Sequence, residues 1–294
     1  MTSVQSVQSN GITIAYDDEG SGQPLVLLHG HPFDRSMWRP QTAHFSRAGM
    51  RVIAPDLRGY GGSSVVPGKT PLATFARDLA ALLDRLGIER FVLGGLSMGG
   101  QIVMECYRQF PERIRALLLA DTFAATDSDE GRAVRLRTAE RLLAEGMAGY
   151  AHEALPKMIA PAHVTALPEV AAHVLEMMKN ASPEGAAAAL RGRAERPDYT
   201  GLLPQITVPT LVVVGTEDEF TPVADARLIH EAVPGSRLTL VQGAGHMPNL
   251  ERPEEFNAAL TDFLESLPDE AEGGAGAGVE VGSGVEAGAE RHSR

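Results

Sequence analysis

The sequence predicts an α/β fold with one mostly parallel central sheet flanked by helices. Through the first 120 residues, short apolar runs bounded by turn residues alternate with longer amphipathic segments, which is the pattern of a parallel sheet covered by helices. A block of helical segments follows, and the alternation then resumes. The later strands argue against two separate domains, so we interpret the block as an insertion into one sheet domain.

The first predicted strand, 12–16, alternates apolar and polar residues with period two and is expected to be half-buried. The others are continuous apolar runs, as expected for strands covered on both faces. They are 25–28, 51–54, 91–93, 114–120, 210–214 and 238–241.

Helices are predicted between these strands, over 38–48, 72–86, 101–110, 223–232 and 256–264. Gly87 provides a stop for the second helix, and Pro253 followed by two glutamates marks the start of the last. The inserted block, 126–200, contains helical segments broken by four prolines: Pro156, Pro161, Pro168 and Pro183. We therefore expect a core domain of 1–125 and 201–267. The segment 268–294 lacks aromatic residues and periodicity and is expected to be a disordered tail.

Composition narrows the possible functions. Of 294 residues, 44% are hydrophobic, and the net charge of −12 argues against nucleic-acid or anionic-membrane partners. Cys106 is the single cysteine, so no intrachain disulfide is possible, and we expect a buried structural thiol. Residues 1–10 have neither a basic region nor an apolar run, and no apolar stretch is long enough for a membrane span. A cytoplasmic location is the resulting expectation.

The stretch 93–100 joins a strand to a helix and contains Gly95-Leu96-Ser97-Met98-Gly99. Glycines two residues before and after a serine are typical of a nucleophile elbow, where the turn is too tight for larger side chains. The elbow holds the serine hydroxyl above the sheet edge, and the N–H of Met98 then faces the position of an oxyanion. The alternative is a glycine-rich turn that happens to contain a serine. A nucleophile is indicated only if the rest of the chain also provides a histidine, an acid and a second oxyanion donor.

A nucleophilic serine needs a histidine base and an acid that orients it. Asp218 follows the strand 210–214, and His246 follows the strand 238–241 on a glycine-rich loop. Both therefore belong to the carboxyl edge of the sheet. Asp121 is a rival acid, because it ends the strand 114–120; Glu217 and Glu219 are weaker rivals. Five other histidines lack metal-ligand spacing and are interpreted as surface or cap residues: His44, His152, His163, His173 and His230.

The loop after strand 25–28 reads His29-Gly30-His31-Pro32. Its small glycine lets the backbone approach a substrate, and the N–H of His31 is the candidate second donor to the oxyanion. His29 is interpreted as a structural residue that fixes the loop.

These motifs together resemble the α/β-hydrolase superfamily over about residues 12–267. The matching segments are His29-Gly30-His31-Pro32, Asp56-Leu57-Arg58-Gly59-Tyr60-Gly61-Gly62-Ser63, Gly95-Leu96-Ser97-Met98-Gly99, Gly215-Thr216-Glu217-Asp218 and Gly245-His246. The resemblance implies Ser97 as nucleophile, His246 as base and Asp218 as acid, with the oxyanion hole at Met98 and His31. It also implies that the insertion is a cap over the pocket and that Asp56 and Arg58 brace nearby loops.

Within the superfamily, the chain resembles small carboxylesterases and 3-oxoadipate enol-lactonase-like proteins, through the elbow and the segment 36–38. We expect hydrolysis of a small-molecule ester or lactone through an acyl-enzyme, with no metal or cofactor. The same triad would suit a C–C bond hydrolase or a cofactor-free perhydrolase or haloperoxidase. A non-catalytic ligand receptor is disfavoured, because all three triad positions carry reactive residues. Families with an aspartate nucleophile are excluded by Ser97.

Apolar residues beside these motifs are candidates for the substrate pocket, with membership of the core as the alternative for each: Phe33, Trp38, Phe123 and Met247, together with Met98. Three arginines of the insertion, Arg132, Arg135 and Arg137, would suit a carboxylate-bearing substrate, although a solvated helix face is the favoured interpretation. Neither the substrate's identity nor the oligomeric state follows from the sequence.

Overall fold

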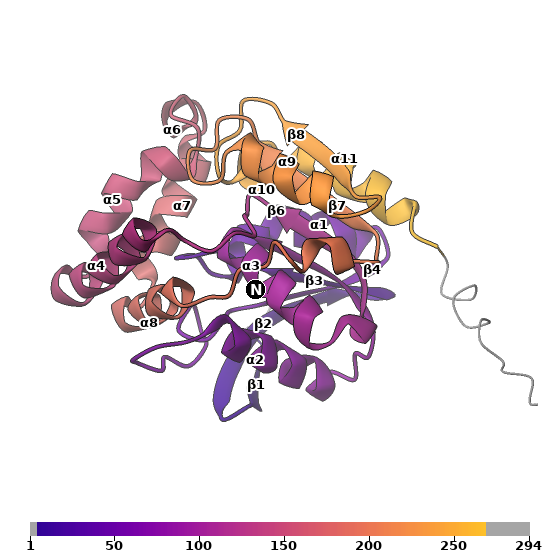
Figure 1. The fold of residues 1–294 in the computed structure, drawn as a ribbon, viewed down its shortest axis with the longest axis horizontal. Coiled ribbons are helices and arrows are strands. Elements are labelled where there is room, and N and C mark those ends of the chain that lie inside the picture. Colours follow the sequence, from indigo (N-terminus) through magenta and orange to yellow (C-terminus); the bar gives the residue numbers. More distant parts are fainter. Residues whose placement is uncertain (1–4, 269–294) are drawn as a thin grey trace, which may run out of the picture.

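The computed structural model describes residues 5–268. They form an eight-stranded sheet with helices on both faces (Figure 1). The strands are β1 (Gln5–Ser9), β2 (Ile12–Gly20), β3 (Gln23–Leu28), β4 (Met50–Pro55), β5 (Phe91–Leu96), β6 (Ile114–Ala120), β7 (Thr210–Gly215) and β8 (Arg237–Val241). Only β2 runs antiparallel to its neighbours in this described sheet, so the predicted mostly parallel α/β architecture is confirmed.

The strand order is β1-β2-β4-β3-β5-β6-β7-β8. The chain leaves β3 on one side to form β4 and later returns on the other side of β3 as β5. The loops that follow β3 and β5 therefore diverge at the carboxyl edge, which is where open α/β sheets form binding crevices. This topology places the loop at His31 beside the turn at Ser97.

The helices of the sheet domain are α1 (Arg39–Arg47), α2 (Leu72–Arg85), α3 (Met98–Gln109), α9 (Val223–Ala232), α10 (Pro248–Glu251) and α11 (Pro253–Glu265). Short 3₁₀ helices cover Arg35–Trp38, Pro111–Arg113 and Leu203–Gln205. Successive strand residues face opposite sides: Val26 joins the core beneath α2 and α3, whereas Leu25 joins the core beneath α1 and α11. Covering both faces explains the continuous apolar strands. Cys106 is buried in the first of these cores, as predicted.

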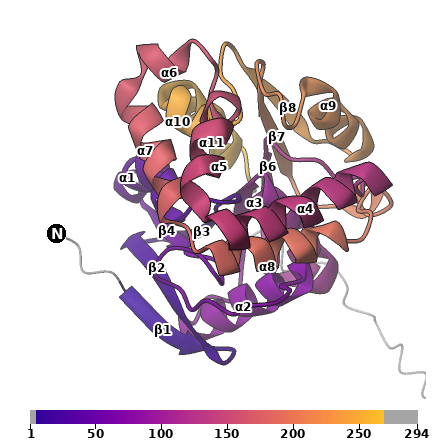
Figure 2. The ribbon, with the colours of Figure 1, turned by 90° about the vertical axis from the view of Figure 1, so that its left-hand side faces the viewer.

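Five helices lie between β6 and β7 and form the inserted cap: α4 (Asp129–Glu145), α5 (Met147–Met158), α6 (His163–Ala166), α7 (Pro168–Asn180) and α8 (Pro183–Ala194). Figure 2 shows α4, α5, α7 and α8 in front of the sheet. Pro168 and Pro183 begin helices, where their missing N–H has no cost. Pro156 does not break α5, contrary to the sequence interpretation, because the helix ends only two residues later.

The structure contains one strand that the sequence analysis missed. β1 is a polar edge strand paired with β2, and only its Val7 is half-buried against the core, so no hydrophobic alternation marks it. Among the described residues, no helix has the length and apolar character needed to cross a membrane. The predicted disordered tail falls, apart from its first residue, outside the described residues.

Gly99 marks the closest approach between α3 and β3. A Cβ on this residue would lie 2.2 Å from the carbonyl oxygen of Leu28. Because that oxygen belongs to the central sheet and cannot withdraw, we expect Gly99→Ala to lower the free energy of unfolding by about 1–3 kcal/mol. Urea unfolding measures this change.

Gly149 in α5 is the matched control, since a Cβ there would meet nothing closer than an Arg141 nitrogen at 3.9 Å. Gly149→Ala should leave the free energy of unfolding unchanged or raise it by up to about 1 kcal/mol, because alanine favours the helix. Equal losses for the two variants would contradict the close approach at Gly99.

Candidate active site

Ser97 occupies a strained turn between β5 and α3. Its φ of 58° and ψ of −117° lie in a region that non-glycine residues seldom adopt. The backbone around it holds this conformation: its N–H donates to Ala120 O at 2.9 Å, and its carbonyl accepts the Thr122 hydroxyl at 2.7 Å. A Cβ on Gly95 would lie 2.4 Å from the carbonyl carbon of Gly99, which explains the first glycine of the motif, and the approach to Leu28 explains the second.

His246 and Asp218 form a buried pair at the ends of neighbouring strands. Nδ1 of His246 lies 2.7 Å from Oδ2 of Asp218, and the residues are 2% and 6% exposed. The other carboxylate oxygen accepts the N–H groups of Phe220 and Thr221 at 2.8 and 3.1 Å, and the Thr221 hydroxyl donates to Oδ2. Burial alone would raise the pKa of Asp218, but His246 and the hydrogen bonds from Thr221 hold it below its usual value. Asp218 is therefore an ionised acceptor.

Asp121, the rival acid, lies beside this pair but differs from Asp218 in its hydrogen bonds and in the direction of its pKa shift. Its Oδ1 accepts the N–H of Gly215 at 2.9 Å, whereas Oδ2 is buried with no partner among the described residues. Burial, reinforced by the charge of Asp218, raises the pKa of Asp121 well above its usual value. The carboxyl group of Asp121 is therefore harder to ionise than that of Asp218, and Asp218 is the acid that binds Nδ1 of His246.

One ligand atom each from Asp121, Asp218 and His246 lies within 4.8 Å of the others, a grouping that in other settings binds a divalent cation. Asp218, however, already accepts hydrogen bonds from two N–H groups, a hydroxyl and the imidazole. These bonds occupy the lone pairs of the Asp218 carboxylate. The three residues therefore fit an acid–histidine pair better than a metal centre.

The loop that carries His246 is held by Glu251, a buried acid. Its Oε1 accepts the N–H of Gly245 at 2.9 Å, and its Oε2 accepts the N–H of Ala160 at 2.8 Å. Nδ1 of His163 lies 2.7 Å from Oε2. His163 is therefore buried and links α6 to the histidine loop, which corrects its assignment as a surface or cap residue.

The two expected oxyanion donors are neighbours of Ser97. Met98 is the first residue of α3, so its N–H has no acceptor within the helix. His31 follows Gly30, where a Cβ would lie 3.2 Å from the Ser97 Cβ. Nδ1 of the His31 ring lies 2.7 Å from the Tyr60 hydroxyl, and burial together with nearby Arg193 lowers the pKa of His31 well below its usual value. The His31 ring is therefore neutral.

Two interactions brace the surrounding loops. His29 Nδ1 donates to the Gly30 carbonyl at 2.8 Å, and its Nε2 accepts the N–H of Leu57 at 2.9 Å, consistent with the structural role predicted for it. Asp56 accepts the N–H groups of Arg35 and Gly62 at 2.8 and 2.7 Å. These bonds fix the loop after β3 against the loop after β4.

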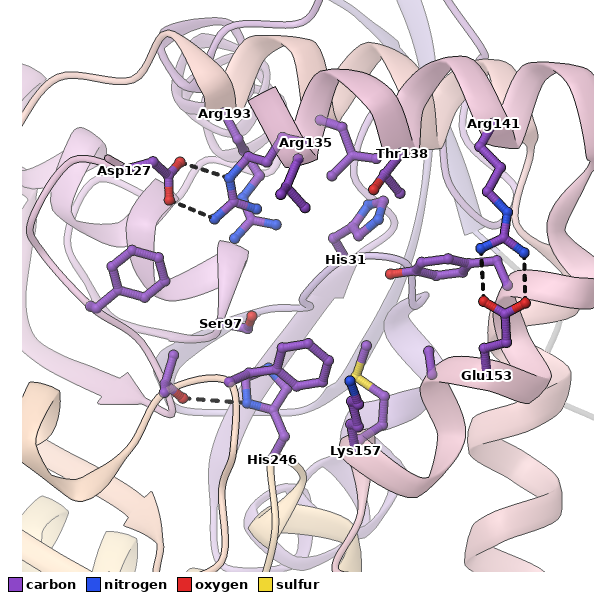
Figure 3. A pocket seen from close by; sticks show the side chains of 18 residues that line it. His31, Ser97, Asp127, Arg135, Thr138, Arg141, Glu153, Lys157, Arg193 and His246 are labelled. Carbon is purple, nitrogen blue, oxygen red and sulfur yellow. Dashed lines mark hydrogen bonds and ion pairs between the residues drawn. The ribbon is translucent and has the colours of Figure 1, made fainter. Parts of the chain in front are cut away.

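A cavity of about 480 Å³ lies between the cap and the sheet edge, and both Ser97 and His246 line it (Figure 3). No hydrogen bond joins the Ser97 hydroxyl to the ring in the described chain; such bonds are often long before substrate binds. Of the apolar pocket candidates, Phe123 lines the cavity and Met98 does not. Phe33, Trp38 and Met247 do not; they belong to the core beneath α1 and α11, where the Trp38 and Phe256 rings lie 6.1 Å apart.

Most of the cavity wall comes from the cap, and most of these residues were not identified from the sequence. Its cap residues are Asp127, Val134, Arg135, Thr138, Arg141, Tyr150, Glu153, Ala154, Lys157, Met158, Leu190 and Arg193. Arg135 faces the cavity and pairs with Asp127, which corrects the favoured assignment to a solvated helix face. Arg132 and Arg137 pair with exposed acids outside the cavity. No local pattern distinguishes Arg193 from the other arginines of the cap.

Residues 23–253 match the family model described as the alpha/beta hydrolase fold. A thermophilic esterase from Thermogutta terrifontis, solved with malate bound, is 39% identical, with a TM-score of 0.86 over 90% of this chain and 97% of that one. The 3-oxoadipate enol-lactonase 2 of Acinetobacter baylyi is 32% identical over 89% of this chain and 94% of its own. A bromoperoxidase from Bacillus anthracis is 29% identical, with a TM-score of 0.78 over 86% and 96% of the two chains.

The two buried acids lead to opposite expectations for stability. Because the pKa of Asp121 is raised by folding, the folded state binds more protons above the usual carboxyl pKa, and the free energy of unfolding falls as the pH rises through that window. Asparagine has no proton to lose. Asp121→Asn should therefore be more stable than the unaltered protein at pH 7, with the difference shrinking towards about pH 4. Urea unfolding at the two pH values measures it.

Asp218→Asn is the matched control. The lowered pKa of Asp218 contributes stability above the usual carboxyl pKa, so this variant should be less stable at pH 7 and approach the unaltered protein as the pH falls below about 4. Changes of the same sign in both variants at pH 7 would show that the two carboxyl groups do not differ in protonation.

Proposed function

Since the chain belongs to the alpha/beta-hydrolase family, we propose that it hydrolyses carboxylic esters or lactones through an acyl-enzyme formed on Ser97. The observation that carries the proposal is the buried His246–Asp218 hydrogen bond of 2.7 Å, on the same cavity as a serine held in a strained elbow. The esterase and enol-lactonase relatives support this substrate class.

Acylation begins when the Ser97 oxygen attacks the carbonyl carbon and its proton passes to Nε2 of His246. Asp218 accepts the Nδ1–H of the ring, which selects the tautomer with a free Nε2 and stabilises the imidazolium that forms. The N–H groups of Met98 and His31 donate to the tetrahedral oxyanion. Each such donor contributes about 3 kcal/mol to transition-state stabilisation.

The intermediate collapses when the carbon–oxygen bond to the alcohol breaks and His246 returns its proton to that oxygen. A water molecule then gives a proton to His246 and attacks the acyl carbon, and breakdown of this second intermediate releases the acid and restores the Ser97 hydroxyl. For a lactone, alcohol and acid leave as one hydroxy acid. These steps do not require the side chain of Asp121 or of His31 to accept a proton.

The C–C bond hydrolase and perhydrolase alternatives use the same serine and histidine and differ in product. The bromoperoxidase relative makes peracid formation worth measuring in the same assay. A vinylogous diketone and an acetate–peroxide mixture should therefore be included beside a series of 4-nitrophenyl esters and lactones. We expect ester or lactone turnover to exceed both other reactions.

Covalent labelling tests the nucleophile directly. A fluorophosphonate probe should label the unaltered protein at Ser97, because the reagent captures a serine activated by a neighbouring base. Ser97→Ala should lose the label and nearly all ester hydrolysis. Asp218→Asn should retain the fold and lower kcat by about a thousandfold or more, because it favours the wrong histidine tautomer.

Asp121→Asn is the control for Asp218→Asn, since both remove a carboxyl group next to the same ring. We expect Asp121→Asn to keep kcat within about threefold of the unaltered value, because the asparagine amide oxygen can still accept the N–H of Gly215 and the His246–Asp218 bond is retained. Equal labelling of the Ser97→Ala protein, or a larger loss from Asp121→Asn than from Asp218→Asn, would refute the proposed roles.

A further inference from the structure

Arg193 is a buried cation on the wall of the cavity that contains Ser97 and His246. It is 6% exposed, and its Nε donates to Oε1 of Gln101 at 3.0 Å. Within residues 5–268, no carboxylate forms an ion pair with it, and neither of its two Nη atoms has a hydrogen-bond partner. Neither Nη atom is among the fully buried unpaired atoms of the described residues, so both still reach the cavity. Guanidinium donors without a carboxylate partner on a cavity wall form a candidate anion site.

The position of Arg193 is fixed by the packing of α8 on the sheet domain. Gly185 and Gly192 bring the helix backbone against Gly59 and Thr70, so closely that a Cβ at either glycine would overlap the other segment. The N–H of Thr70 also donates to the carbonyl of Ala188 at 2.9 Å. Together with the Gln101 bond, this packing holds the guanidinium at the cavity (Figure 3).

The charges around Arg193 do not neutralise it. The negative charge of Asp127 acts on Arg193. Arg135, however, binds Asp127 through two bonds of 2.7 and 3.0 Å, and Arg196 binds it as well. Burial lowers the pKa of Arg193, and Arg135 and Arg196 lower it further. A guanidinium nevertheless stays protonated in proteins. This side of the cavity therefore carries excess positive charge.

The outer wall adds no compensating acid. Glu153, which lines the cavity, is bound by Arg141 through two bonds of 2.7 and 2.6 Å. Lys157 also lines the cavity, is exposed, and has no ion pair in the part of the chain that the structure describes. The lining is therefore suited to an anion, and the two unpartnered Nη atoms match the two oxygens of a carboxylate.

We propose that Arg193 binds a free carboxylate of the substrate, so that the preferred substrates are half-esters of dicarboxylic acids or lactones bearing a carboxylate side chain. The inference rests on the proposed function, because it assigns a substrate class to the same cavity. Arg193 acts in it as a specificity-determining residue: it anchors the non-reacting end of the molecule while the ester or lactone carbonyl lies at Ser97.

Monomethyl and dimethyl glutarate provide a matched pair of substrates, one anionic and one neutral, with methanol release as the readout. We expect kcat/KM for the monoester to exceed that for the diester by about tenfold or more, which is the contribution of a hydrogen bond to a charged group. Arg193→Met should lower kcat/KM for the monoester by about 10–100-fold, mainly through KM, because ground-state binding is lost. Dimethyl glutarate and 4-nitrophenyl acetate should change by less than about threefold.

Two variants separate binding from folding. Arg191→Met makes the same substitution on the same helix, where the guanidinium pairs with Glu140 at 2.7 Å, and should leave the monoester preference unchanged. Arg193→Lys keeps the positive charge and should retain part of the monoester preference that Arg193→Met loses. Competitive inhibition of 4-nitrophenyl acetate hydrolysis by glutarate gives a second readout and should weaken about tenfold in Arg193→Met. If Arg193→Met does not fold, Arg193→Gln is used in its place for both measurements.

A protein that cleaves neutral esters but shows no preference for the monoester, or an Arg193→Met variant that loses activity on all substrates equally, would overturn this inference and leave the proposed function intact. The second result would mean that Arg193 only attaches the cap to Gln101. Loss of the proposed function itself has a separate signature: no labelling of Ser97 and no hydrolysis of any ester or lactone.

Discussion

The strained turn at Ser97 is the constraint on which the rest of the structure depends. A left-handed backbone at a serine is unfavourable and persists only where the surroundings enforce it. Here β6 accepts the serine N–H, and the start of α3 lies against β3 so closely that only glycine fits at position 99. The elbow, the central strands and the first turn of α3 are therefore one packing unit.

The sheet brings the remaining polar groups to this turn. Asp121, Asp218 and His246 each follow a strand of the parallel set, and the strand order makes those strands neighbours. Two adjacent buried carboxyl groups cannot both ionise at low cost, and their hydrogen bonds decide between them. Asp218 receives four donors and its pKa is lowered, whereas Asp121 receives one and its pKa is raised.

In the proposed function, the sheet positions the reacting groups and the cap positions the group that selects the substrate. The helix α8 rests on the sheet domain through glycine contacts, and its last turn places Arg193 on the cavity wall. The neighbouring acid is already bound by other arginines, so the Arg193 donors that reach the cavity are free to bind an anionic ligand. The proposed reaction and the proposed substrate class thus come from different layers of one cavity.

The sequence by itself determined the alternation of strands and helices and pointed to Ser97, Asp218 and His246, because strand burial, turn glycines and chain order are local patterns. Only the tertiary structure decided which acid binds His246, because Asp121 and Asp218 both follow strands and differ in their hydrogen bonds. It also decided that Phe33, Trp38 and Met247 are core residues, that His163 is buried, and that Arg193 faces the cavity. Those outcomes depend on how helices distant in sequence pack together, and helical periodicity specifies a buried face without specifying what it is buried against.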